Sequence, residues 1–268
     1  DEAFIASDVP AILKYTKNYY LLDENEIAVL DDGKVEFFDV HGMPVEKEML
    51  VADFDMEAAE KGGYAHFMLK EIHEQPTAIK TTITPRIVDG MPNLEECGLT
   101  YDRLKGYNNI FVVACGTAMH AGLVGKYVLE KIGRVPVTVD MASEFRYRDP
   151  IAKGDLVILV SQSGETADTL AALRMAKERG AETLSIVNVK GSSIARESDM
   201  VLYTHAGPEI SVASTKAYIV QLSVFYLLSF AIAYAHGAIS KEECMRLTAE
   251  LQNVPNMLEV VLKTPDNC

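Results

Sequence analysis

Apolar strand-like runs alternate with helical sequence in the middle of the chain, and this alternation constrains the fold more than any other feature. The runs IFVVA at 110–114 and DLVILV at 155–160 have no polar residue within their apolar part, which is typical of strands covered on both faces. Helical sequence follows each run, at 119–132 and 167–179. This pattern continues to residue 204 and predicts a doubly wound α/β domain with about five parallel strands over residues 84–240.

The sequence on either side of this domain has a different character. Residues 1–57 contain short β-prone runs separated by DDG and HG turns, which predicts the C-terminal part of an antiparallel, β-rich second domain. Residues 58–83 read as a helical lead-in, which Pro76 is expected to interrupt or kink. Residues 241–268 are assigned to a C-terminal helix and the start of a linker. Because the chain begins with Asp1 rather than methionine, we expect it to be a piece of a longer protein.

Charge and cysteine content argue against several classes of function. The formal net charge is 25 − 39 = −14, whereas nucleic acids and anionic membranes are bound by basic surfaces. The 4 cysteines form no CxxC pair and no zinc-like spacing, which indicates a reduced, cytoplasmic protein without a metal site. The sequence also lacks the glycine-rich motifs of dinucleotide and Walker-type sites, so we expect no cofactor.

The stretch 217–235 is apolar over a length that could cross a membrane. It includes Gln221, Ser223 and Ser229, and no basic cluster flanks it to set an orientation. A helix that is apolar all round is also found in protein cores and subunit interfaces. We therefore expect this helix to be buried in the core or in the interface of a homodimer.

Residues 161–166 (SQSGET), which we call the hydroxyl loop, follow one of the buried strands. Ligands of open parallel sheets bind at the carboxyl ends of the strands. The loop offers the hydroxyls of Ser161, Ser163 and Thr166 just before a predicted helix, whose free N–H groups attract anions. The alternative is that these residues only cap the helix. Three hydroxyls together with the Gln162 amide favour an anion site.

Two further stretches are weaker candidates. Cys115-Gly116-Thr117-Ala118 also joins a strand to a helix and should lie at the same edge of the sheet. Cys115 has no partner base in the pattern, so a core thiol is favoured over a nucleophile. Residues 209–216 (EISVASTK) precede the long apolar helix, and the sequence leaves open whether they cap that helix or cover a sugar.

Several motifs occur in one order along the chain and carry a resemblance. They are CGTAMHAG, ASEFRYRDP, SQSGETADTL, NVKGSSIARESD and PEISVASTKA. Together they resemble the first sugar isomerase (SIS) domain of the glutamine–fructose-6-phosphate aminotransferase family. HFMLKEIHEQP at 66–76 is similar to the helix that opens the isomerase part of these enzymes, and IASDVPAILKYT at 5–16 to the end of their glutaminase domain.

This resemblance implies a flavodoxin-like SIS domain that binds a phosphosugar as a part of a longer enzyme. It implies that Ser161, Gln162, Ser163 and Thr166 hold the phosphate, and that Thr117, Val212 and Ser214 contact the sugar. Many relatives have serine where this chain has Ala118, so a hydroxyl contact is expected to be absent there.

The family transfers ammonia from glutamine to fructose 6-phosphate and isomerises the product to glucosamine 6-phosphate. By the same resemblance, its cysteine nucleophile lies in the N-terminal glutaminase domain, and the Schiff-base lysine and the proton-transferring glutamate lie in a second SIS domain and C-terminal tail. The chain is therefore expected to contain no catalytic residue. Two alternatives are a free-standing phosphosugar sensor and an aldose–ketose isomerase that acts alone, for which Glu165 and Glu209 are the nearest candidate bases.

Overall fold

The computed structural model describes residues 2–6, 12, 15–31, 33–52 and 61–264. The chain divides into two compact units, 1–65 and 66–268, which are described here separately. The boundary predicted between residues 57 and 58 falls in the stretch 53–60, outside the described residues.

The smaller unit is rich in strands, as the sequence predicts. Its β2 (Glu26–Asp31) and β3 (Lys34–Asp39) form an antiparallel hairpin in which Asp31 lies opposite Lys34. Its β1 (Asn18–Tyr19) and β4 (Leu50–Val51) form a second, shorter antiparallel pair. Gly33 lies in the turn between the two strands with φ of +74°, a conformation that glycine adopts without steric cost.

A five-stranded parallel sheet forms the centre of the larger unit, as predicted. Its strands lie in the order β11-β10-β9-β7-β8, so the chain starts next to one edge with β7, moves to that edge with β8 and returns to build the other side. The direction of winding reverses between β7 and β9, which is the flavodoxin-like arrangement. The strands are β7 (Ile110–Ala114), β8 (Val137–Met141), β9 (Leu156–Ser161), β10 (Glu182–Val187) and β11 (Met200–Tyr203).

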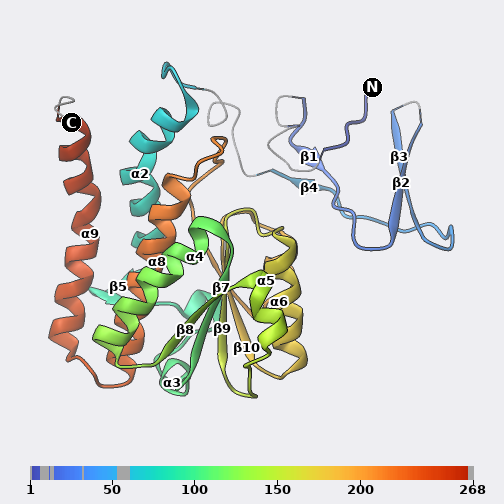
Figure 1. Ribbon diagram of the computed structural model, residues 1–268. Coiled ribbons are helices and arrows are strands. Elements are labelled where there is room, and N and C mark those ends of the chain that lie inside the picture. The colour runs from blue at the N-terminus through green and yellow to red at the C-terminus, as the bar shows by residue number, and fades with distance from the viewer. Residues whose placement is uncertain (1, 7–11, 13–14, 32, 53–60, 265–268) are drawn as a thin grey trace. The chain divides into compact units, whose positions relative to one another are not determined.

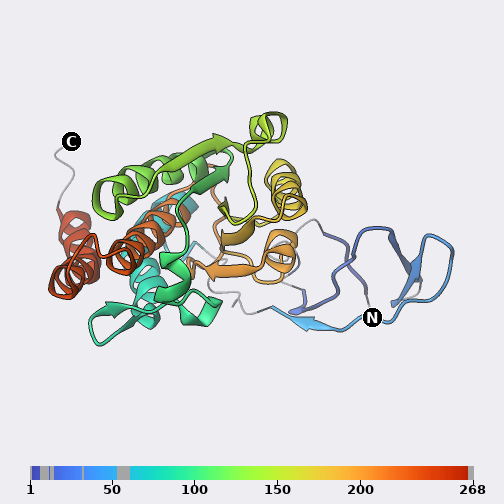
Figure 2. The ribbon, with the colours of Figure 1, turned by 90° about the horizontal axis from the view of Figure 1, so that it is seen from below.

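Helices cover both faces of this sheet (Figures 1 and 2). Alternate strand residues point to opposite faces, so Ile110 and Val112 join one hydrophobic cluster while Phe111 and Val113 join another. The first face packs against α4 (Gly116–Val128), its π-helical extension η3 (Leu129–Gly133) and α8 (Lys216–Ala235). The second face packs against α5 (Ala142–Arg148), α6 (Ala167–Glu178) and α7 (Ser193–Glu197).

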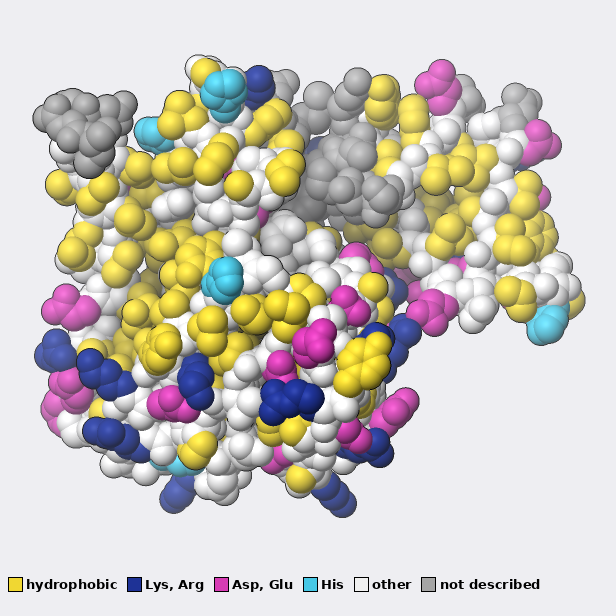
Figure 3. Space-filling view, in the orientation of Figure 1, with side chains coloured by type: hydrophobic (Ala, Val, Ile, Leu, Met, Phe, Trp, Pro, Cys, Tyr) yellow, Lys and Arg dark blue, Asp and Glu magenta, His cyan; other side chains and the backbone are white. Residues whose placement is uncertain are grey.

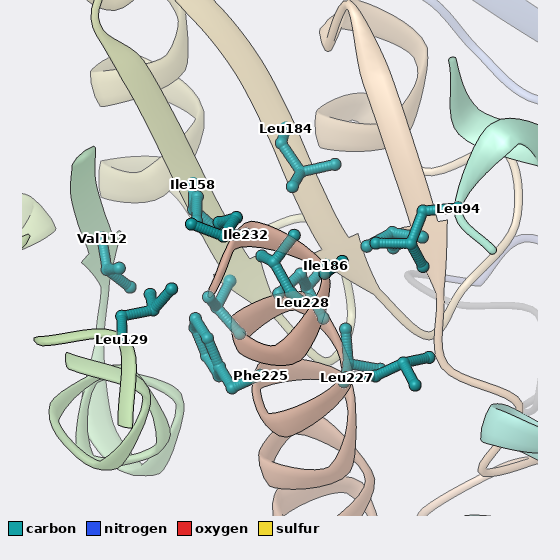
Figure 4. Close-up of a cluster of buried hydrophobic side chains, with 14 of the residues drawn as sticks. Leu94, Val112, Leu129, Ile158, Leu184, Ile186, Phe225, Leu227, Leu228 and Ile232 are labelled. Carbon is teal, nitrogen blue, oxygen red and sulfur yellow. The ribbon is translucent and has the colours of Figure 1, made fainter. Parts of the chain in front are cut away.

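Helix α8 is the central helix of the larger core. By length and composition it could span a membrane, but 72% of its most apolar window is buried inside the unit. It packs between α4, α2, α3 and α9, and its Phe225, Leu228 and Ile232 meet Ile158 and Ile186 of the sheet in the cluster of Figure 4. Burial of these side chains is a major source of stability. The expectation of a buried core helix is confirmed.

Outside this layer lie two long helices and a compact connection. The helices are α2 (Phe67–Ile83) and α9 (Lys241–Lys263), which pack against each other and against α8. Helix α2 continues through Pro76, which the sequence predicted to interrupt or kink it. The stretch between α2 and β7 contains η1 (Thr84–Arg86), β5 (Ile87–Val88), β6 (Met91–Pro92), η2 (Glu95–Cys97) and α3 (Tyr101–Lys105).

The contact between α4 and α8 supplies a test of this packing. A Cβ atom on Gly125 would lie 2.5 Å from Cδ1 of Phe225, whose side chain is 1% exposed. We predict that Gly125→Ala lowers the free energy of unfolding by about 1–3 kcal/mol through overpacking, even though alanine is the better helix former. Urea denaturation followed by circular dichroism measures this change.

Gly133→Ala is the matched control, because a Cβ there would meet its nearest neighbour, Ile232, at an ordinary 3.6 Å. We expect this control to change stability by no more than about 0.5 kcal/mol. Equal losses in the two variants would contradict the close approach of α4 to Phe225.

Candidate functional site

Two loops that the sequence singled out leave neighbouring strands at the point where the winding reverses. In the register of β7 with β9, Ala114 lies opposite Val160, so Cys115 and Ser161 follow at the same level of the sheet. Helix α4 begins directly after the first loop, and α6 begins directly after the hydroxyl loop. The two helix N-termini therefore start from adjoining strand ends, which is the usual place for a ligand in this class of sheet.

Hydrogen bonds inside the hydroxyl loop fold it into a tight turn. The hydroxyls of Ser161 and Thr166 lie 2.9 Å apart, and the backbone N–H of Gly164 donates to Ser161 Oγ at 3.0 Å. The N–H of Glu165 donates to Ser163 Oγ at 3.2 Å. Thr166 occupies the N-cap position of α6 without using its side chain as a cap. Capping alone therefore does not account for this loop, since its last hydroxyl turns to Ser161 instead.

Gly164 allows the hydroxyl loop to lie against the residues that follow β10. Its φ is +69°, and a Cβ at this position would lie 2.0 Å from Oγ of the buried Ser192. The carbonyl of Gly164 accepts a hydrogen bond from the N–H of Ile194 at 3.0 Å. No residue other than glycine fits both this backbone conformation and this contact.

Glu165 also joins the hydroxyl loop to the residues that follow β10. Its carboxylate does not face the sheet edge as a free group. Its Oε1 accepts a hydrogen bond from the N–H of Ser193 at 2.8 Å, at the start of α7. Behind the loop, the guanidinium of Arg174 on α6 donates to both oxygens of Glu197 on α7 at 2.8 Å. These hydrogen bonds lower the pKa of the Glu197 carboxyl. Glu165 thus holds the hydroxyl loop to α7, and Glu197 holds α6, the helix that follows the loop, to α7.

The loop after β7 places Thr117 in the first turn of α4 with its side chain exposed. Cys115, the N-cap residue, makes no side-chain cap bond, and its sulfur lies 4.0 Å from the hydroxyl of Thr169. Ala118 is 8% exposed and belongs to the larger hydrophobic cluster. Thr117 is therefore the residue of this loop whose hydroxyl is open to a ligand.

The 209–216 segment is held by carboxylates and starts α8. Oε1 of Glu209 accepts hydrogen bonds from the N–H groups of Thr215 and Ala217, at 2.8 and 3.1 Å, and Oε2 accepts one from the Ser214 hydroxyl at 2.9 Å. Glu209 therefore caps the helix, and Thr215, the N-cap residue, does not use its side chain for this. Val212 is fully exposed.

The structure brings the four predicted phosphate residues together in one loop and places Thr117 at the adjoining strand end. Val212 and Ser214 belong to a separate segment, which is tied to α2 through the buried carboxylate of Glu71. The sequence analysis missed Glu71, and it also missed Asn188, whose amide joins the end of β10 to the carbonyl of Gly207 at 2.8 Å. Neither residue can be recognised from the sequence around it, because each forms its hydrogen bonds with residues far along the chain.

Comparison with known proteins agrees with the fold. Residues 103–231 match the model of the SIS domain. Almost the whole chain is homologous to part of the glutamine–fructose-6-phosphate aminotransferases (isomerizing). The relative from Caldanaerobacter subterraneus subsp. tengcongensis is 53% identical over 97% of this chain and 43% of its own length. The relative from Thermus thermophilus is 46% identical over 98% of this chain and 43% of its own length.

A solved structure shows the same fold. The C-terminal domain of glucosamine-fructose-6-phosphate aminotransferase from Francisella tularensis is 41% identical, with a TM-score of 0.72 over 76% of this chain and 57% of that one. The chain spans only about two fifths of the length of the curated relatives named above, 43% in both cases.

The close approach at Gly164 can be tested against a second left-handed glycine. We predict that Gly164→Ala lowers the free energy of unfolding by about 2–4 kcal/mol, because it adds a clash with Ser192 to the cost of a positive φ. Gly116→Ala is the control, since its φ of +56° imposes the same kind of backbone cost with nothing within 4 Å of the new Cβ. We expect the control to lose only about 1–2 kcal/mol. Chemical denaturation that ranks the control as the more damaged variant would contradict the packing of the hydroxyl loop on α7.

Proposed function

We propose that this chain is the phosphosugar-binding part of an enzyme that converts fructose 6-phosphate and glutamine to glucosamine 6-phosphate and glutamate. The observation that carries the proposal is the hydroxyl loop, which lies at the reversal point of a SIS sheet directly before the N-terminus of α6. The product would feed amino-sugar synthesis, including UDP-N-acetylglucosamine and cell-wall precursors.

In this proposal, Ser161, Gln162, Ser163 and Thr166 hold the phosphate, and Thr117, Val212 and Ser214 contact the sugar. The loop contains no lysine or arginine, so neutral donors and the dipole of α6 would bind the phosphate. Such donors bind an anion through hydrogen bonds that are stronger than those between neutral groups. This is compatible with a chain whose net charge is −14.

We further propose that the chain binds the sugar but does not transform it. The two carboxylates that could act as bases in an isolated isomerase are both engaged, because Glu165 accepts from the start of α7 and Glu209 accepts at the start of α8. A carboxylate can act as a general base only where it lies within reach of a substrate proton. Ammonia supply and isomerisation would then be carried out by a glutaminase domain and a second SIS domain of the longer enzyme.

The longer enzyme is proposed to work in the cytoplasm as a homodimer. Apolar side chains are exposed along α2 and α9, and Figure 3 shows apolar side chains gathered over these helices. An exposed apolar surface of this kind usually marks a contact with another protein surface. The exposed residues include Met68, Leu69, Met257, Val260 and Val261.

Calorimetric titration of the chain with glucosamine 6-phosphate tests the binding role. We expect glucosamine 6-phosphate to bind more tightly than either glucosamine or inorganic phosphate, because the proposed site recognises both halves of the ligand. Binding of glucosamine that equals binding of its phosphate would contradict the assignment of the hydroxyl loop.

The same titration on two variants tests individual hydroxyls. We predict that Ser163→Ala and Thr166→Ala each weaken glucosamine 6-phosphate binding by about 1.5–3 kcal/mol, the usual worth of a hydrogen bond to a charged group. Thr81→Ala is the control, because the Thr81 hydroxyl only donates to the carbonyl of Thr77 in its own helix. Unchanged affinity in both loop variants would remove the phosphate assignment.

A further inference from the structure

The 209–216 segment is anchored to α2, a helix that lies outside the matched SIS range of 103–231. The anchor is Glu71, whose side chain is almost completely buried, with 2% of the residue exposed. A buried carboxylate is costly unless donors surround it, so its partners are informative about its role. All three of the described donors to Glu71 belong to Ile210 and Ser211.

The contacts of Glu71 fix the backbone of the segment directly. Oε1 accepts hydrogen bonds from the N–H of Ile210 at 2.6 Å and from the N–H of Ser211 at 3.2 Å. Oε2 accepts from the Ser211 hydroxyl. The first of these contacts joins residues that are 139 positions apart in the chain. The next residue, Val212, is fully exposed, so the anchor holds the base of a stretch that projects into solvent.

Two other residues of α2 hold the ends of the same region. Glu74 pairs with the buried ammonium of Lys216 at 2.6 Å, where α8 begins. Oγ1 of Thr82 accepts a hydrogen bond from the N–H of His205 at 3.1 Å, shortly after β11. Residues 71, 74 and 82 follow helical spacing along one side of α2. One face of this helix therefore braces the chain from the end of β11 to the start of α8.

We propose that Glu71 is a positioning residue that holds the 209–216 segment where it can contact the sugar of a bound phosphosugar. This inference rests on the proposed function, because Val212 and Ser214 are the assigned sugar contacts in this segment. It adds a residue from outside the SIS domain to the machinery of sugar recognition. Glu71 itself touches no ligand in this proposal and acts only through the backbone of Ile210 and Ser211.

Binding of the sugar and binding of the phosphate should depend differently on Glu71. The hydroxyl loop is held by its own hydrogen bonds and by Glu165 against α7, none of which involves α2. Loss of the Glu71 carboxylate should therefore free the sugar contacts and leave the phosphate contacts in place. A general loss of folding would instead weaken both halves together.

The test uses Glu71→Gln, which keeps the size of the side chain but replaces one acceptor oxygen with an NH₂ group that cannot accept from the segment. We expect hydrogen–deuterium exchange to accelerate at the Ile210 and Ser211 amides and to stay unchanged in the hydroxyl loop. Calorimetry should show glucosamine 6-phosphate binding weakened by about tenfold or more, the range for losing a charge-assisted hydrogen bond. The affinity for inorganic phosphate should stay within about twofold, a change of about 0.4 kcal/mol.

Ser211→Ala is a milder variant that removes only the hydroxyl contact to Glu71, and it should shift both readouts in the same direction by a smaller amount. Glu182→Gln is the matched control. Its carboxylate accepts hydrogen bonds from Arg103 at 2.8 and 3.0 Å, but it lies at the first residue of β10, the opposite end of the strand from the site. This control should lower stability without changing either affinity.

Each outcome decides a separate part of the proposal. Unchanged amide exchange at 210–211 in both segment variants overturns the anchor itself. Faster exchange with unchanged glucosamine 6-phosphate binding, or with equal losses for the sugar phosphate and inorganic phosphate, overturns the role in sugar recognition. An unmodified chain that binds no phosphosugar refutes the proposed function and the sugar-positioning role with it, while the exchange data still establish whether Glu71 anchors the segment.

Discussion

The parallel pairing of β7 with β9 is the contact on which the site depends. It places the first and third strands of the sheet side by side, so that β8 continues in one direction and β10 in the other. The loops that leave β7 and β9 must then separate toward opposite faces, into α4 and α6. Two helix N-termini therefore begin at adjoining strand ends. The rest of the larger unit supports this pairing by covering the strands on both faces.

Around the candidate site, carboxylates fix loop backbone instead of facing the proposed phosphate. Glu165 binds the start of α7, Glu209 binds the start of α8, and Glu71 binds the backbone before Val212. Carboxylates accept strongly from N–H groups at helix starts, where the dipole also favours negative charge. Their charges are directed into hydrogen bonds with the protein. The hydroxyls of the loop therefore remain the groups suited to an anionic ligand.

Helix α2 links the matched SIS domain to the sequence that precedes it. It packs on α8 and α9, and through Glu71, Glu74 and Thr82 it also holds the chain between β11 and α8. Its course through Pro76 shows how tertiary packing overrides local preference, since Pro76 is itself buried. The loss of one helical hydrogen bond at proline is offset by burial along the helix. The SIS fold of this chain thus includes a helix that the domain match leaves out.

The sequence by itself determined the parallel sheet, its helical layers and the hydroxyl loop. These features are local, because an unbroken apolar run marks a doubly covered strand and the residues Ser161, Ser163 and Thr166 lie within one turn. The composition of α8 also predicted its burial, because its polar residues and the lack of a flanking basic cluster favoured a core helix over a membrane span. Only the tertiary structure decided that Thr166 turns to Ser161 rather than capping α6, that Gly164 packs on Ser192, and that Glu71 anchors Ile210. The last two of these contacts join groups whose distance apart is set by the packing of whole helices and strands, and no pattern of neighbouring residues encodes that distance.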